Sequence, residues 1–132
     1  MSAERLDYMI FPRLIALGER AWNPEPTWTK NQSEFLGQWN SFVNTLGQKD
    51  LPRLDYFHGG ILYRIPTPGV IIEEGTLKIN SEIPGFTYRY TTNGAEPDEN
   101  STVYSGPIAV QGTVKVKAFA TNGRSSRTVS VK

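Results

Sequence analysis

The feature that most constrains this chain is a change of hydrophobic period near its middle. Before the Pro-Thr-Pro-Gly segment at residues 66–69, apolar residues recur every three or four positions, as they do on one face of a helix. After it, short runs alternate apolar and polar residues, as strands with one buried face do. We therefore predict an α+β fold with segregated parts, in which helices at residues 1–66 precede a small antiparallel β-sandwich at residues 67–132.

The first helical segment, at about residues 3–22, is apolar on most of its faces. Spacings of three and four place two sets of apolar residues on two faces: Leu6, Ile10, Leu14, Leu17 and Ala21, and then Tyr8, Phe11, Ile15 and Trp22. Pro12 has no N–H to donate to the residue four positions before it. We therefore expect a kink there, or a break that restarts the helix at Pro12. A helix with so broad an apolar surface is usually buried inside a larger assembly.

The second helical segment, residues 30–46, is predicted to be an amphipathic surface helix. Its apolar stripe consists of Phe35, Trp39, Phe42 and Leu46. Thr29 with Gln32 three residues later forms the pattern of a capping box at its start. Gly47 stands where a left-handed C-cap is expected to end it.

The second half of the chain reads as short strands separated by turn residues. Six runs are rich in Val, Ile, Thr and Tyr, and pairs such as Glu-Gly, Pro-Gly, Asn-Gly and Ser-Gly lie between them. In the run TVKVKAFAT, Val114, Val116 and Ala118 point to one face and the two lysines to the other. That strand is therefore predicted to have one face in a core and one in solvent.

Composition narrows the classes of site and partner. The chain has 14 basic and 13 acidic residues and a net charge of +1, so nucleic acid is not an expected partner. There is no cysteine, and His58 is the only histidine, which excludes thiolate and histidine-cluster metal sites. We expect no metal and no cofactor. No apolar run approaches the roughly 20 residues of a membrane span, and no leader pattern follows Met1, so we expect neither a membrane span nor a signal peptide.

Three stretches of the sequence resemble one known family. ERLDYMIFPRLIALGERAW resembles the last helix of the catalytic (β/α)8 barrel of family 20 glycoside hydrolases, the β-N-acetylhexosaminidases, in the motif residues Pro12, Arg13, Glu19, Arg20 and Trp22. LPRLDYFHGGILYRIP is similar to the segment that ends this barrel. YTTNGAEPDENSTVYSGPI is similar to the immunoglobulin-like C-terminal domain of chitobiases and bacterial hexosaminidases. The resemblance implies that the predicted sandwich is immunoglobulin-like and that the helices are the end of a barrel.

The resemblance also implies which residues carry the chemistry. Family members hydrolyse terminal N-acetylhexosamine residues with retention, using an Asp-Glu pair on an earlier barrel strand and the substrate's own acetamido group as nucleophile. A Trp-x-Glu motif on the last strand binds sugar. No Trp-x-Glu occurs here, and the one Asp-Glu dipeptide, Asp98-Glu99, lies in the β-rich part, where we interpret it as solvated turn charges. A full barrel needs about 250 residues. We therefore expect a C-terminal fragment that is catalytically silent, with no catalytic or substrate-binding residue of its own.

The same resemblance sets expectations for partners and location. The piece would close and stabilise the barrel, so its partners are the rest of the catalytic barrel in the parent chain and the glycan substrate of the parent. The parent is expected in the bacterial periplasm, on the cell surface or secreted. Because the barrel would normally cover the opening helix, some of Tyr8, Met9, Phe11 and Ile15 should be abnormally exposed or repacked in this chain.

The motif residues admit a second interpretation. Glu19 and Arg20 beside Trp22 could form an acid with a cation partner at an aromatic platform. We favour a structural ion pair that ties the helix to the barrel wall, and we interpret Arg13 as an anchor for the same reason. Two further groups also carry alternatives: Asp98, Glu99 and Asn100 as a calcium site or a polar loop, and Tyr88, Tyr90 and Tyr104 as a sugar-stacking strip or core.

Two functions of another class remain open at this point. The sandwich could be a carbohydrate-binding module, which would require exposed coplanar aromatic residues on its surface. Alternatively, the chain could be an interaction module that dimerises through its apolar helix.

Overall fold

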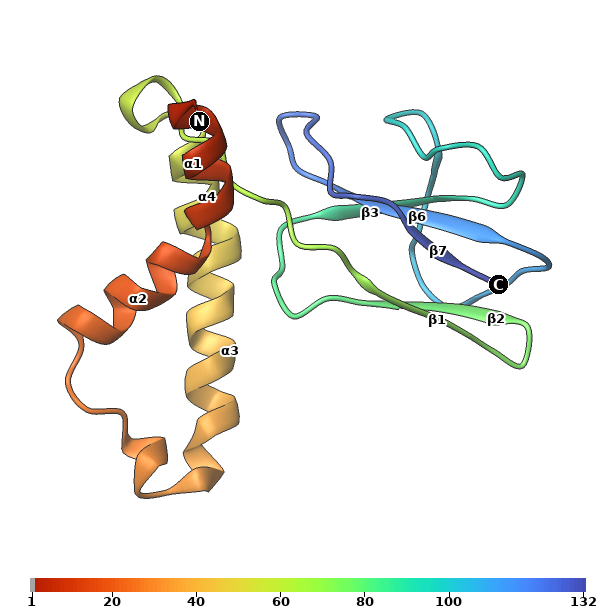
Figure 1. The fold of residues 1–132 in the computed structure, drawn as a ribbon. Coiled ribbons are helices and arrows are strands. Elements are labelled where there is room, and N and C mark those ends of the chain that lie inside the picture. The colour runs from red at the N-terminus through yellow and green to blue at the C-terminus, as the bar shows by residue number, and fades with distance from the viewer. Residues whose placement is uncertain (1) are drawn as a thin grey trace. The chain divides into compact units, whose positions relative to one another are not determined.

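The computed structural model describes residues 2–132, and the chain divides into two compact units, Met1–Arg64 and Ile65–Lys132 (Figure 1). The first unit contains the helices α1 (Ala3–Ile10), α2 (Arg13–Trp22), α3 (Phe35–Thr45) and α4 (Leu51–Leu54), with 3₁₀ turns at Thr27–Thr29, Gln32–Glu34 and Phe57–Gly59. The second contains the strands β1 (Gly69–Glu73), β2 (Thr76–Asn80), β3 (Thr87–Thr91), β4 (Thr102–Val103), β5 (Ile108–Ala109), β6 (Val114–Phe119) and β7 (Val129–Val131). All of these helices precede all of these strands, so the predicted α+β class is confirmed.

Pro12 separates α1 from α2. Ser2 caps α1, because its hydroxyl accepts a hydrogen bond from the Arg5 N–H at 3.3 Å. α1 ends at Ile10, since Pro12 has no N–H for the carbonyl four residues earlier. α2 then restarts with Pro12 as its N-cap residue, whose carbonyl accepts from the Ile15 N–H at 3.0 Å. The predicted break that restarts the helix at Pro12 is confirmed.

The first two helices contribute only partly buried side chains to the packing of this unit. No residue of α1 or α2 is buried, although both carry apolar stripes. Met9 is 59% exposed and Leu17 is 64% exposed, while Tyr8, Phe11 and Ile15 are half-buried. The expectation that part of the opening helix is abnormally exposed is therefore confirmed.

The start of the second helical segment differs from its prediction. Thr29 does not form a capping box, because its hydroxyl donates to the Pro26 carbonyl at 2.7 Å. Asn31 forms the cap instead: its carboxamide oxygen accepts from the Ser33 N–H at 3.3 Å and opens a 3₁₀ turn. The regular helix α3 begins only after this turn, at Phe35.

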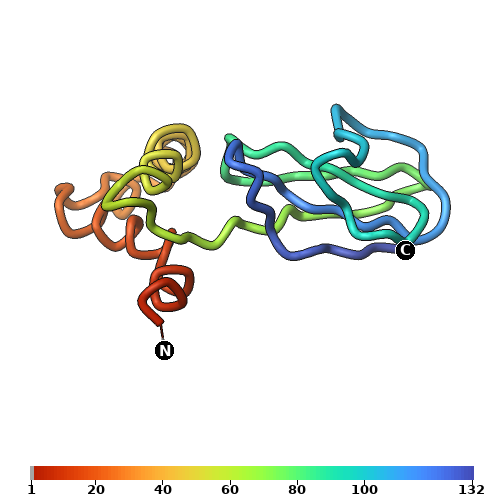
Figure 2. Tube along the Cα trace, turned by 90° about the horizontal axis from the view of Figure 1, so that it is seen from above, coloured from red at the N-terminus to blue at the C-terminus, as the bar shows by residue number. Residues whose placement is uncertain are grey.

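The end of the segment also differs, because Gly47 does not terminate the helix. The chain continues from α3 through one π-helical turn, Leu46–Asp50, directly into α4. Figure 2 looks nearly along α3, the yellow coil, and shows this continuation. Gly47 is buried beside the core of this unit, which consists of Val43, Leu46, Leu51, Leu54 and Tyr63. Burial of leucines on both sides of the turn outweighs the local preference of glycine for a left-handed cap, so the C-cap prediction is wrong.

The strands form two antiparallel sheets, which appear as two layers in Figure 1. One sheet has the order β1-β2-β5 and the other the order β4-β3-β6-β7. The fourth strand pairs with β3, whereas in immunoglobulin constant domains it joins the sheet of the first two strands. The predicted β-sandwich is confirmed.

The core of the sandwich comes from the inner faces of both sheets. Leu77 of β2 packs with Tyr90 of β3 and with Val114 and Val116 of β6, and none of these side chains is more than 8% exposed. Ala118 continues the buried face of β6. The predicted core face of this strand is confirmed, whereas its other face is not open to solvent, because the side chains of Lys115 and Lys117 are only 26% and 19% exposed.

Tyr104 covers the part of β2 that β5 leaves open. β5 pairs only with Thr76 and Leu77 of β2. Further along β2, the Ile79 N–H donates to the Tyr104 hydroxyl at 3.2 Å. The Tyr104 N–H itself donates to the Tyr88 carbonyl at 2.8 Å. One residue after β4 therefore links both sheets.

Glu96 holds the loop between β3 and β4 on the outer face of β6. Its carboxylate pairs with Lys115 at 2.8 Å and Lys117 at 3.3 Å, and it accepts a hydrogen bond from the Thr128 hydroxyl. The hydrogen bond from Lys115, followed by the one from Thr128, lowers the pKa of Glu96 from 4.5 to about 2. We call this arrangement the Glu96 clamp.

The substitution Tyr104→Phe tests the link between the sheets. It leaves a partly buried N–H of Ile79 without an acceptor, so we expect a loss of about 1–2 kcal/mol in the free energy of unfolding of the sandwich. All three tryptophans lie before residue 40, so their fluorescence does not report on the strands. The measurement is therefore urea unfolding followed by NMR amide signals of β2 and β6. The matched control is Tyr88→Phe in β3, which should cost less than about 0.5 kcal/mol; equal losses would contradict the assigned role.

The Glu96 clamp predicts a specific acid dependence. Because the pKa of Glu96 is lower in the folded chain, its contribution to stability is fully present above pH 4.5 and is lost as the pH falls toward about 2. The free energy of unfolding of the natural chain should therefore fall more steeply across this window than that of the Glu96→Gln variant. Urea unfolding at a series of pH values measures both slopes. Parallel slopes would show that the clamp does not act in solution.

Candidate functional site

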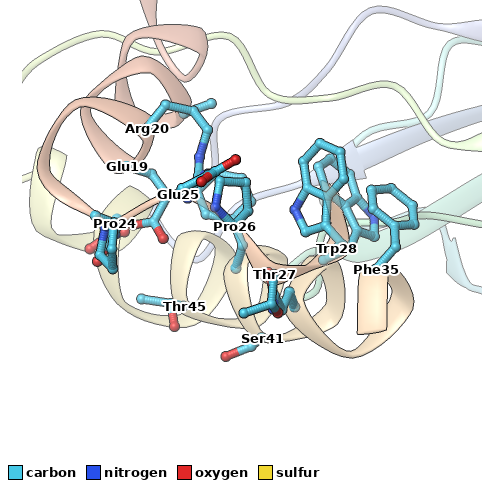
Figure 3. Close-up of a pocket in the computed structure, with 16 residues that line it drawn as sticks. Glu19, Arg20, Pro24, Glu25, Pro26, Thr27, Trp28, Phe35, Ser41 and Thr45 are labelled. Carbon is cyan, nitrogen blue, oxygen red and sulfur yellow. The ribbon is translucent and has the colours of Figure 1, made fainter. Parts of the chain in front are cut away.

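A groove of about 520 Å³ lies within the first unit, between one face of α2, the segment that follows it and one face of α3 (Figure 3). Glu19 and Arg20 line it from α2, and Phe35, Trp39 and Phe42 line it from α3. Ala16 also lines the groove, three and four positions before the two charged residues, and the three α3 residues are three, four or seven positions apart, so each set lies along one helix face. A volume of this size is in the range of small-molecule sites.

Four aromatic rings form a row along this groove. Trp28 meets Phe35 edge-on with ring centroids 5.5 Å apart, Phe35 stacks with Trp39 at 6.3 Å, and Trp39 lies 5.9 Å from Phe42. Trp28, Phe35 and Trp39 each remain 36–39% exposed. The helical stripe predicted three of the four residues of this aromatic row. Trp28 was not predicted because it lies in the short 3₁₀ turn Thr27–Thr29, which is too short for a hydrophobic period to indicate the direction of its side chain.

The segment between the two helices is fixed by its own polar contacts. The Thr27 hydroxyl donates to the Glu34 carboxylate and accepts from the Gln38 carboxamide. The Asn31 carboxamide also donates to Glu34, at 3.1 Å. Through these bonds the start of α3 holds the segment that carries Trp28, so the aromatic row is positioned by contacts within this unit.

The five motif residues do not converge on one point. Glu19 and Arg20 lie on the groove, whereas Pro12, Arg13 and Trp22 are not among the residues that line it. Trp22 is 90% exposed. Within residues 2–132, no salt bridge involves Arg13, Glu19 or Arg20. The aromatic platform beside an acid and a cation, which sequence reasoning kept as an alternative, is therefore not assembled at Trp22 in this chain.

The acidic loop residues are engaged in their own turn. The Asp98 carboxylate accepts hydrogen bonds from the Ser101 hydroxyl and the Asn100 N–H, each at 2.9 Å, and these bonds lower its pKa. Glu99 instead lies against Gly123 in the loop between β6 and β7. In the part of the chain that the structure describes, no three His, Asp or Glu side chains are close enough to hold a metal ion together. The geometry favours the polar loop over the calcium site.

The tyrosines of the sandwich belong to its interior. Tyr90 is 8% exposed, and Tyr104 packs against the same core. Tyr88 is half-buried and pairs with the buried Ala118. Among residues 65–132, no aromatic side chain is exposed. A sugar-stacking strip at these tyrosines is therefore wrong, and the core interpretation holds.

Chemically, the groove offers ring faces with separate polar groups at its edge. Such a lining suits packing against another apolar surface or binding of an amphipathic ligand.

Within residues 2–132, no helix is long and apolar enough to cross a membrane.

Comparison with known proteins gives a consistent result. The family model described as the chitobiase/beta-hexosaminidase C-terminal domain matches residues 50–128. An N,N'-diacetylchitobiase of Vibrio harveyi is 32% identical over 147 aligned residues, which cover 98% of this chain and 16% of that protein. Beta-hexosaminidases of Vibrio vulnificus and Porphyromonas gingivalis are each 27% identical, over 96% and 95% of this chain and 17% and 16% of theirs.

The chain therefore corresponds to about one sixth of the length of these relatives. The matched region begins in the helical unit and runs through almost the whole sandwich. The resemblance first noted on three sequence stretches is confirmed, and the chain belongs to the chitobiase/beta-hexosaminidase C-terminal domain family.

Proposed function

We propose that the chain is the C-terminal part of a bacterial β-N-acetylhexosaminidase whose catalytic residues lie outside residues 1–132. Residues 1–66 would be the last helices of the (β/α)8 barrel, and residues 67–132 would be its immunoglobulin-like C-terminal domain. The role of this part is to close and stabilise the barrel, and by itself it is inactive.

One observation carries the proposal: α1 and α2 each carry an apolar stripe and yet have no buried residue. Leu6, Met9, Leu14 and Leu17 are all 44–64% exposed. Shielding a leucine or methionine from water contributes roughly 1.5–3 kcal/mol. Several such side chains on one helix pair are a surface that an adjoining structure would cover, and the wall of a barrel is such a structure.

The five motif residues fit this role as contacts to the barrel. Arg13, Glu19 and Arg20 have no ion-pair partner among residues 2–132, which leaves them available to groups of the missing barrel. Trp22 is almost fully exposed and would pack there. Pro12 starts α2 and so sets where these side chains project. We assign all five a structural role.

The parent would release terminal N-acetylhexosamine without a metal or cofactor. Support comes from the names of the relatives, which are bacterial chitobiase and beta-hexosaminidases. The Asp98-Glu99 pair does not replace the missing catalytic pair, since Asp98 is engaged in its loop and Glu99 lies against another loop. A location in the periplasm, on the cell surface or outside the cell follows from the same assignment.

The first test is a direct assay. Residues 1–132 should release no chromophore from a nitrophenyl N-acetylglucosaminide above a buffer control, because the catalytic residues of the proposed parent lie outside this segment. The longer protein that contains this segment should hydrolyse the same substrate. Turnover by the isolated chain would contradict its inactivity, and an inactive longer protein would contradict the assignment of the parent.

The second test compares one substitution in two contexts. Leu17→Glu should change the stability of the isolated chain by less than about 0.5 kcal/mol, because the side chain is already 64% exposed. In the parent the same change would bury a charge against the barrel and destabilise it by roughly 2–5 kcal/mol. Thermal unfolding measures the change in stability of the isolated chain, and heat inactivation measures that of the parent.

Gln48→Glu is the matched control, since it adds the same charge at an exposed position of the π-helical turn. It should have little effect in either context. If Leu17→Glu leaves the parent unaffected but dissociates a dimer of the isolated chain in light scattering, the interaction-module interpretation replaces the barrel interpretation.

A further inference from the structure

The tripeptide Thr-Asn-Gly occurs twice in the sandwich, in two loops whose glycine nitrogens have different surroundings. Residues 92–94 lie in the loop between β3 and β4, and residues 121–123 lie in the loop between β6 and β7 (Figure 1). An asparagine before a glycine can lose its side-chain amide, because a glycine N–H without a neighbouring side chain can reach the asparagine carbonyl carbon. Two identical tripeptides in one chain allow the effect of structure on this reaction to be separated from that of sequence.

Both asparagines are folded for the reaction. Asn93 accepts a hydrogen bond from the Ala95 N–H at 3.0 Å, and Asn122 accepts one from the Arg124 N–H at 3.1 Å. Each bond turns the carboxamide back over the glycine peptide that follows it. Both asparagine side chains are exposed, and both glycines have positive φ, +80° at Gly94 and +83° at Gly123.

The two glycine nitrogens, however, are in different environments. The Gly123 N–H donates to the Ala120 carbonyl at 3.1 Å, and Gly123 is partly buried with the Glu99 carboxylate against it. The Gly94 N–H has no hydrogen-bond acceptor within residues 2–132, Gly94 is exposed, and no atom lies within 4 Å of the position of a β-carbon there. The attacking nitrogen is therefore free at Gly94 and engaged at Gly123.

We propose that Asn93 is a site of spontaneous deamidation and that the fold protects Asn122. The Gly94 nitrogen forms a bond to the side-chain carbonyl carbon of Asn93. The bond from that carbon to the side-chain nitrogen breaks, and ammonia leaves with the proton that the Gly94 nitrogen releases. Water then opens either carbonyl of the resulting succinimide, giving aspartate or isoaspartate, so the only co-reactant is water.

The modification would act on the Glu96 clamp. The side chain of Asn93 caps Ala95, whose carbonyl accepts from the Thr91 hydroxyl at 2.6 Å, and Glu96 follows directly. Isoaspartate lengthens the backbone at position 93, and either product adds a negative charge three residues before the Glu96 carboxylate. Both changes loosen the attachment of the loop to β6. The proposal rests on the sandwich alone and is independent of the function assigned to the parent.

The experiment incubates the folded chain in warm, mildly alkaline buffer and follows both tripeptides by peptide mapping and mass spectrometry. Asn93 should convert several-fold faster than Asn122. The same incubation in denaturant should bring the two rates close together, because the hydrogen bond at Gly123 is then lost. Asn93→Gln should remove the fast conversion, and the matched variant Asn122→Gln should leave it unchanged.

Three results would overturn the proposal. These are equal or faster conversion at Asn122 in the folded chain, no conversion at Asn93, and a rate ratio that is the same in denaturant. The last would assign the difference to the residues after each glycine, alanine in one case and arginine in the other. For the effect on the clamp, amide exchange in residues 95–101 should speed up in the converted chain, and unchanged exchange would exclude that step.

Discussion

Burial of Leu77 between Val114 and Val116 is the contact on which the second unit depends. These three side chains are fully shielded from water and come from both sheets. Because the sheets are held face to face by this contact, β2 and β3 lie where Tyr104 can join them, and β6 presents its lysines to the β3–β4 loop. The Tyr104 link between the sheets and the Glu96 clamp both depend on this core, and neither could form without it.

The helical unit lacks a comparable constraint in its first half. Among its described residues, the buried ones all lie after residue 42. There, α3, the π-helical turn and α4 form one continuous helical segment with a leucine-rich face. Among the described residues, one backbone hydrogen bond joins the α1–α2 segment to this part, from the Arg64 N–H to the Phe11 carbonyl at 3.1 Å. A helix pair with this composition and this little burial is stable only if something else supplies the contacts.

Prediction from sequence succeeded where the signal was a period or a turn, and failed where a local rule competed with burial. The β1–β2 hairpin illustrates the first case: Glu74 and Gly75 both have positive φ, as a two-residue primed turn requires, and the flanking strands pair in register. Gly47 illustrates the second, because a cap rule uses only neighbouring residues and cannot account for Leu51 and Leu54, which are buried in the core four and seven positions later. The groove could not be predicted from the sequence for a similar reason. Helical spacing predicts which face of α3 carries Phe35 and Trp39, but no pattern predicts that Trp28, in a 3₁₀ turn before α3, extends the row.

Glu19, Arg20 and Trp22 show that residues grouped by a sequence motif need not form one site in the structure. By chemistry alone, an acid, a guanidinium and an indole within four residues could form a binding site. In the structure, the indole is almost free of contacts and the two charges have no ionic partner in the described chain, so the three do not act as a unit. Charged groups that remain unpaired at an apolar helix surface are costly to cover unless the covering surface supplies partners. A barrel wall over α2, as proposed, would therefore have to offer both an apolar surface and opposite charges facing Glu19 and Arg20, and that requirement is more selective than hydrophobicity alone.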